Sequence, residues 1–134
     1  MQAIRLLIGD GHELIRRGIR ALIQEQPGWQ IAAEANDGRE AVAKANELKP
    51  DVAILDIAMS SLNGLDATEQ ILKFSPHTKV LILTIHESDQ LIHKILDAGA
   101  RGYILKTDAD RDLIMAVKTL LSNKTFFPRS SGRI

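Results

Sequence analysis

The sequence predicts a single α/β domain in which helices cover both faces of a doubly wound parallel sheet. Five short apolar runs recur at nearly even intervals, and a segment with helical periodicity follows each run. The runs are continuously apolar, which is typical of parallel strands buried on both faces. A chain of 134 residues with 45% hydrophobic and 25% charged residues also suits one domain with a buried core. We therefore expect five β–α units joined by right-handed crossovers.

In the first two units, the strands are expected at residues 4–8 and 30–33. Each following helix is indicated by apolar residues that recur on one helical face. These residues are Leu14, Ile15, Gly18, Ile19, Leu22 and Ile23 in the first helix, and Ala41, Val42, Ala45 and Leu48 in the second. Gly28 and the pair Lys49-Pro50 mark the points where the chain turns.

In the last three units, the strands are expected at residues 52–55, 80–83 and 103–105. The matching helical faces are Leu65, Thr68, Ile71 and Leu72, then Leu91, Ile92, Ile95 and Leu96, and finally Leu113, Ile114, Val117, Leu120 and Leu121. Periodicity ends after this helix. We therefore expect the domain to span residues 1–122, with residues 123–134 forming a frayed tail or the start of a linker.

Composition excludes several classes of protein. Seventeen Lys and Arg residues balance seventeen Asp and Glu residues, so this segment lacks the basic surface expected of a nucleic-acid binder. It has no cysteine, and so no disulfide, thiolate metal site or cysteine nucleophile. The first residues have neither a signal-peptide core nor a membrane span. We expect a cytoplasmic protein with no membrane partner. The four histidines show no metal-ligand spacing and are expected at the surface; they are His12, His77, His86 and His93.

Polar residues follow all five strands, at the edge of the sheet where open α/β folds bind ligands. They are Asp10, Glu34, Asp56, Thr84 and Lys106. Asp56 can act as a nucleophile toward a phosphoryl group. If the first and third strands are neighbours, Asp10 lies beside it, and two close carboxylates favour a cation such as Mg²⁺. Thr84 and Lys106 can then stabilise the transferred phosphoryl group.

Each of these residues also has an ordinary structural interpretation. Asp10 can cap the first helix, and Asp56 can cap the turn after its strand. Thr84 can be a normal strand residue, and Lys106 can be a solvated charge. Tyr103 can be a core aromatic residue. Their combined positions at one edge favour a phosphoryl site. The segment at residues 9–14 nearly matches a dinucleotide-binding fingerprint but lacks its third glycine, so a nicotinamide or flavin enzyme is the weaker alternative.

Six motifs occur in a characteristic order along residues 4–122. They are IRLLIGDGH at 4–12, LIRRG at 14–18, PDVAILDI at 50–57, NGL at 63–65, LT at 83–84 and AGARGYILK at 98–106. In this order and spacing the sequence resembles the receiver domains of bacterial response regulators, most closely those of the NarL/FixJ (LuxR-type) transcription regulators. The resemblance implies a flavodoxin-like sheet with strand order 2-1-3-4-5.

The resemblance also implies roles for individual residues. A sensor histidine kinase would phosphorylate Asp56, and Mg²⁺ would be held by Asp56, Asp10 and the backbone carbonyl of Ala58. Lys106 would pair with a phosphoryl oxygen. Thr84 and Tyr103 would be the switch pair that remodels the surface of the fourth helix, fifth strand and fifth helix. Such a domain is a phosphoacceptor, not an enzyme, with at most autophosphotransfer and autodephosphorylation activity.

Two positions depart from the pattern of the family. Gly11 replaces the second acidic residue after the first strand, so the more direct Mg²⁺ carboxylate is missing. We expect weaker Mg²⁺ binding and weaker phosphorylation, unless water or Glu13 substitutes for the lost ligand. Ser60 replaces a proline, which predicts a less rigid loop. A phosphorylation-deficient receiver-like interaction module is therefore the main alternative.

The resemblance extends to the output of the protein. Regulators of this class carry a DNA-binding helix-turn-helix domain after a linker, and these 134 residues do not include one. Any DNA contact would be made through an output domain outside the chain. The first and fifth helices are also expected to leave surface available for a homodimer.

Overall fold

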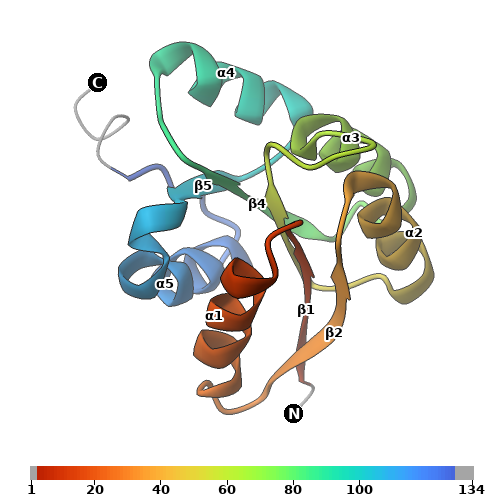
Figure 1. Cartoon of the computed structure of the whole chain (residues 1–134), viewed down its shortest axis with the longest axis vertical. Coiled ribbons are helices and arrows are strands. Elements are labelled where there is room, and N and C mark those ends of the chain that lie inside the picture. Colours follow the sequence, from red (N-terminus) through yellow and green to blue (C-terminus); the bar gives the residue numbers. More distant parts are fainter. Residues whose placement is uncertain (1–2, 129–134) are drawn as a thin grey trace.

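The computed structural model describes residues 3–128, which form five strands and five α-helices (Figure 1). The strands pair in parallel in the order β2-β1-β3-β4-β5, which confirms the predicted sheet. The strands are β1 Ile4–Gly9, β2 Trp29–Ala35, β3 Val52–Asp56, β4 Lys79–Thr84 and β5 Gly102–Leu105. The helices are α1 Glu13–Gln24, α2 Gly38–Leu48, α3 Gly64–Phe74, α4 Asp89–Ala98 and α5 Ala109–Leu121, with a short 3-10 helix, η1 Lys106–Asp108, before α5.

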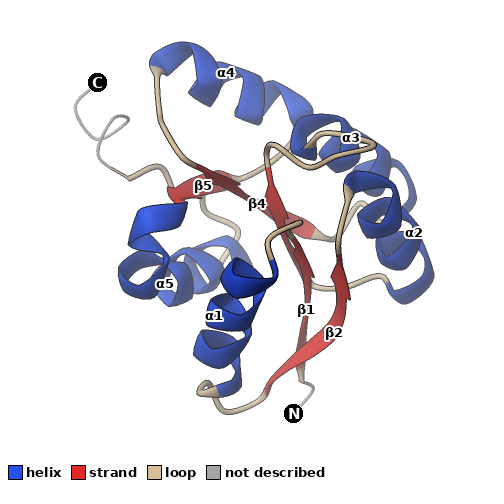
Figure 2. Cartoon of the chain, viewed as in Figure 1, coloured by secondary structure: helices blue, strands red, loops and turns tan. Residues whose placement is uncertain are grey.

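Helices cover both faces of the sheet, as Figure 2 shows. Helices α1 and α5 pack on one face, and α2, α3 and α4 pack on the other. In β3, Ile54 belongs to the first of these apolar layers and Leu55 to the second. Because both faces are buried, β3 contains no polar residue before Asp56.

Three helices begin earlier than their apolar periodicity because polar residues cap their first turns. Asp37 accepts a hydrogen bond from the backbone N–H of Glu40 at the start of α2. Asn63 and Ser88 cap α3 and α4 in the same manner. A cap satisfies backbone N–H groups that have no partner within the helix. The helices therefore start directly after the cap, one to three residues before the apolar stripe.

Part of the segment expected to be frayed is ordered against the sheet. Phe126 forms a parallel bridge with Gly102, its N–H donates to the carbonyl of Arg101, and its carbonyl accepts from the N–H of Tyr103. A Cβ atom on Gly102 would lie 2.4 Å from the Phe126 carbonyl oxygen, so glycine permits this close approach. Residues 129–134 of the predicted tail lie outside the described residues, and the boundary at residue 122 stays a prediction.

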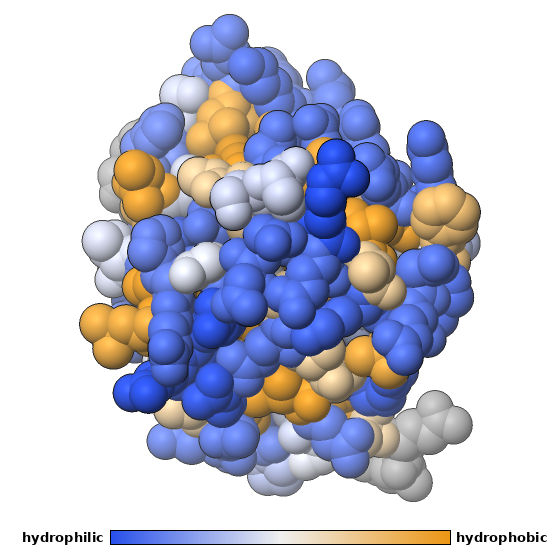
Figure 3. Space-filling view, turned by 45° about the vertical axis from the view of Figure 1, so that its right-hand side comes forward, coloured by the Kyte–Doolittle hydropathy of each residue, from blue (hydrophilic) through white to orange (hydrophobic). Residues whose placement is uncertain are grey.

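The surface carries no broad apolar face in the view of Figure 3, where hydrophobic side chains form small, separate patches among hydrophilic ones. Leu14 on α1 and Met115 on α5 are among the large hydrophobic residues that remain exposed. Within residues 3–128, no helix is both long and apolar enough to cross a membrane.

Candidate functional site

Two buried carboxylates lie together at the carboxyl edge of the sheet. Strands β1 and β3 are hydrogen-bonded neighbours, with Gly9 opposite Leu55, so the next residues, Asp10 and Asp56, stand at the same level. The exposed fraction is 0% for Asp10 and 2% for Asp56. Like charges this close repel each other, so the pair requires a cationic partner.

Lys106 provides that partner. It is the first residue of η1, directly after β5, and its Nζ lies 2.9 Å from Asp56 Oδ2 and 3.0 Å from Asp10 Oδ2. Burial alone would lower the pKa of Lys106. The hydrogen bonds and charges of Asp56 and Asp10 outweigh this effect, so the pKa lies above its ordinary value. The ammonium is therefore charged at neutral pH, and it neutralises one of the two carboxylates.

The two carboxylate oxygens of Asp10 have different partners. Its Oδ1 accepts a hydrogen bond of 2.8 Å from the backbone N–H of His12. Its Oδ2 is buried and lies 3.0 Å from the ammonium of Lys106, and no described residue donates a further hydrogen bond to it. Because Asp56 shares that ammonium, the two carboxylates retain one negative charge that a further cation would balance.

The loop after Asp56 is fixed by backbone contacts. Oδ1 of Asp56 accepts a 3.0 Å hydrogen bond from the N–H of Ala58, an exposed residue. The N–H of Gly64 donates to the carbonyl of Ile57, and a Cβ atom on Gly64 would lie 2.4 Å from the Asp56 carbonyl oxygen. The carbonyl of Ser60 accepts from the N–H of Gly38, so the loop is also tied to the start of α2. The carboxylate of Asp56 is thereby held toward Lys106.

Thr84 and Tyr103 lie on the adjacent strands β4 and β5. Thr84 is buried, and its hydroxyl donates to the carbonyl of His86, 2.9 Å away in the following loop. Tyr103 is completely buried in the layer beneath α4. Its hydroxyl donates to the carboxylate of Glu87 and, over 3.3 Å, to the carbonyl of Pro128. The aromatic ring is thus held inward by two different loops.

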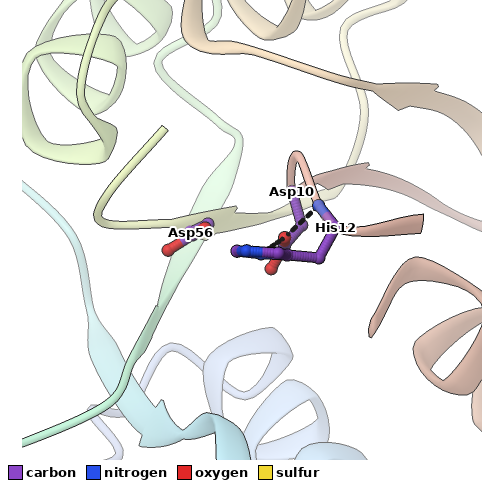
Figure 4. A group of neighbouring side chains, drawn as sticks. All are labelled: Asp10, His12 and Asp56. Carbon is purple, nitrogen blue, oxygen red and sulfur yellow. Dashed lines mark hydrogen bonds and ion pairs between the residues drawn. The ribbon is translucent and has the colours of Figure 1, made fainter. Parts of the chain in front are cut away.

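His12 also lies at this site, although the sequence shows no metal-ligand spacing for it. Figure 4 shows its imidazole extending toward Asp56 beside the carboxylate of Asp10. The ligand atoms of Asp10, His12 and Asp56 all lie within 4.8 Å of one another. His12 is exposed, as expected, and it lies beside two carboxylates that the spacing of the histidines along the sequence did not indicate. Its position two residues after a strand-end aspartate was the available signal.

Glu34 does not take part in the site, although the sequence also predicts it as a polar residue at the end of a strand. It lies within β2, and its carboxylate pairs with Arg20 at 2.7 Å and Arg16 at 3.3 Å on α1. The hydrogen bond from Arg20 lowers the pKa of Glu34, against an opposing effect of partial burial, and Arg16 lowers it further. Glu34 therefore fastens α1 to the edge strand.

We expect Glu34→Gln to lower the free energy of unfolding by about 1 kcal/mol at neutral pH, because this ion pair is partly exposed. A depressed carboxyl pKa contributes stability above the unfolded pKa, and that contribution is lost as pH falls through the folded pKa. Urea unfolding at several pH values tests this. The difference from the wild type should shrink between neutral and strongly acidic pH. Glu13→Gln, which removes an exposed pair with Arg17, is the matched control; an equal effect in both would contradict the assignment.

Comparison with known proteins identifies the family. The family model described as the response regulator receiver domain matches residues 6–118. The chain belongs to this family. It is also 40% identical over 124 residues to the response regulator protein VraR of Staphylococcus aureus, a match that covers 92% of this chain and 59% of that protein. The chain therefore spans about three fifths of the length of this curated relative.

Solved structures show the same fold. A LuxR-family response regulator from Aurantimonas is 29% identical with a TM-score of 0.88, covering 97% of this chain and 92% of that one. RcsB from Salmonella typhimurium, solved in a study of DNA interaction, is 25% identical with a TM-score of 0.88, covering 99% and 67%. The receiver domain thus has NarL- and LuxR-type relatives, as the resemblance implied.

Receiver domains bind Mg²⁺ through acidic residues. Here Asp10 and Asp56 fit that role, because their carboxylates converge and share the single positive charge of Lys106. Gly11 offers no side chain. The site therefore suits a divalent cation but has fewer carboxylates than the pattern of the family.

Proposed function

We propose that this receiver domain accepts a phosphoryl group on Asp56 from a sensor histidine kinase. The observation that supports this most directly is the contact between the buried Asp56 carboxylate and the ammonium of Lys106, 2.9 Å away, beside the second carboxylate of Asp10. A carboxylate oxygen of Asp56 would form a bond to phosphorus while the bond from phosphorus to the donor imidazole nitrogen breaks. The leaving imidazole keeps the electron pair.

The neighbouring side chains have distinct tasks in this transfer. Lys106 pairs with a phosphoryl oxygen and offsets its negative charge. The hydroxyl of Thr84 leaves the carbonyl of His86 in order to donate to the phosphoryl group. That movement alters the loop that also contains Glu87, the hydrogen-bond partner of Tyr103. Thr84 and Tyr103 thereby link phosphorylation to the surface of α4, β5 and α5.

Mg²⁺ would be held by Asp10, Asp56 and the backbone carbonyl of Ala58, and it would supply charge neutralisation for the incoming phosphoryl oxygens. Gly11 removes one carboxylate from this set, so we expect weaker Mg²⁺ binding than a site with an acidic pair achieves. The phosphoacceptor Asp56 itself is present. We therefore expect phosphorylation to occur, with a higher requirement for Mg²⁺.

The expected output is control of transcription through a DNA-binding domain outside this chain, in a cytoplasmic regulator. This rests on the LuxR-type relatives and on the 59% coverage of the curated relative, which leaves room for a second domain there. A homodimer through α1 and α5 is supported by an apolar groove between these helices, which Leu14, Ile15 and Leu22 line. Sedimentation velocity before and after phosphorylation tests the homodimer.

Incubation with acetyl phosphate and Mg²⁺, followed by intact-mass measurement, tests the phosphoacceptor. We expect a gain of one phosphoryl group in the wild type and no gain in Asp56→Ala. Asp97→Asn, which alters an exposed aspartate on α4, is the control and should be phosphorylated normally. Absence of any gain at high donor and Mg²⁺ concentrations would instead support the phosphorylation-deficient interaction module.

A further inference from the structure

The site contains a nitrogen ligand next to its carboxylates. His12 Nδ1 lies 3.0 Å from Asp10 Oδ1, and both groups lie within 4.8 Å of the Asp56 carboxylate (Figure 4). Two ligand atoms that are each about 2.1 Å from an ion are about 3.0 Å apart at an octahedral right angle and about 3.4 Å apart at the tetrahedral angle of Zn²⁺. The His12 and Asp10 atoms are hydrogen-bonded at 3.0 Å, so they can become adjacent ligands of one ion with little movement.

A second observation indicates that this cluster is prepared for a cation. Asp10 is 0% exposed, and its Oδ2 is paired with the same ammonium that Asp56 contacts. Two carboxylates face the single ammonium of Lys106, which leaves one negative charge uncompensated. Lys106 Nζ is also 3.5 Å from His12 Nδ1, so an incoming ion would have to coexist with this ammonium.

The chemistry of the donors determines which ion fits. Mg²⁺ prefers oxygen ligands and retains water, whereas imidazole favours ions such as Zn²⁺ and Ni²⁺. Gly11 removes an oxygen donor next to the nitrogen of His12. The side chain of His12 is 69% exposed, so its ring can adjust its orientation as an ion enters.

We propose that His12 replaces the missing carboxylate and, with Asp10 and Asp56, binds a borderline transition-metal ion such as Zn²⁺ or Ni²⁺. His12 contributes to this binding but not to the binding of Mg²⁺. The inference deepens the proposed function, because it rests on the same site and gives the phosphoacceptor a second class of ion. It predicts that metal selectivity depends on one exposed side chain.

Calorimetric titration of the chain with Zn²⁺ and, separately, Mg²⁺, without a phosphodonor, tests the proposal. We expect His12→Ala to weaken Zn²⁺ binding at least about tenfold and to change Mg²⁺ binding less than about twofold. His93→Ala, which removes an exposed histidine on α4, is the matched control and should change neither. His12→Asn, with a favoured N-cap residue at the start of α1, guards against a folding defect and should lose Zn²⁺ affinity as well.

The NMR signals of the His12 imidazole provide an independent measurement. Zn²⁺ should shift the NMR signals of His12 strongly, and Mg²⁺ should leave them nearly unchanged. The proposal is overturned if His12→Ala affects both ions equally or neither, or if His93→Ala weakens Zn²⁺ binding as much. Because no phosphodonor is present, these results are independent of whether Asp56 gains a phosphoryl group in the mass measurement.

Discussion

Lys106→Met is expected to lower the free energy of unfolding at neutral pH by about 3 kcal/mol, the scale on which breaking a buried ion pair acts. The substitution removes the ammonium that lies 2.9 Å from Asp56 and 3.0 Å from Asp10. Two buried carboxylates would then face each other without a cation. Chemical denaturation in the absence of divalent ions measures the loss.

Two further variants show whether charge is the cause. Lys94→Met alters an exposed lysine on α4 and should change stability by less than about 0.5 kcal/mol. In an Asp56→Asn background, Lys106→Met should cost less, because one of the opposing carboxylates is already neutral. If the loss were the same in both backgrounds, packing of the lysine side chain would explain it and the electrostatic account would be wrong.

The pH dependence follows from the same contacts. The pKa of Lys106 is raised above its ordinary value of 10.5. A raised lysine pKa contributes stability that is fully present below the unfolded pKa and is lost as pH rises through the folded pKa. The stability difference between the wild type and Lys106→Met should therefore be constant near neutral pH and decrease only above about pH 10.

The sequence predicted the sheet well because its strands are buried on both faces. Continuous apolar runs such as β3 have few alternative explanations in a chain of this length. The first and last residues of the helices and strands were harder to predict. Caps such as Asp37 and Ser88 extend helices beyond their apolar stripe, and those hydrogen bonds depend on local backbone geometry. The docking of Phe126 on β5 depends on Gly102, whose role appears only when the two segments meet.

Part of the site was also predictable from the arrangement of the strands. Parallel strands end at a common edge, so Asp10, Asp56 and Lys106 could be placed together from strand ends alone. The same rule misplaced Glu34, because β2 is the edge strand and α1 offers it two arginines. It also missed His12, which reaches the site from a loop. Side-chain direction in loops does not follow from strand periodicity.

Gly11→Asp is expected to raise Mg²⁺ affinity at least about tenfold, because it adds a charged oxygen ligand beside Asp10. The backbone nearly accommodates this change. A Cβ atom on Gly11 would lie 3.1 Å from the carbonyl oxygen of Asn36, so a shift of a few tenths of an ångström suffices. Titration calorimetry measures the affinity, and the Mg²⁺ concentration required for half-maximal phosphorylation should fall in parallel.

Gly18→Asp separates a ligand effect from a general charge effect. Gly18 is an exposed residue of α1 with no atom within 4 Å of a Cβ placed there, so aspartate is accommodated and adds the same charge on the helix instead of in the loop beside Asp10. It should leave Mg²⁺ affinity unchanged. An unchanged affinity in Gly11→Asp would show that position 11 does not reach the ion. A gain in both variants would mean that long-range attraction, which added salt would screen, controls the binding of Mg²⁺.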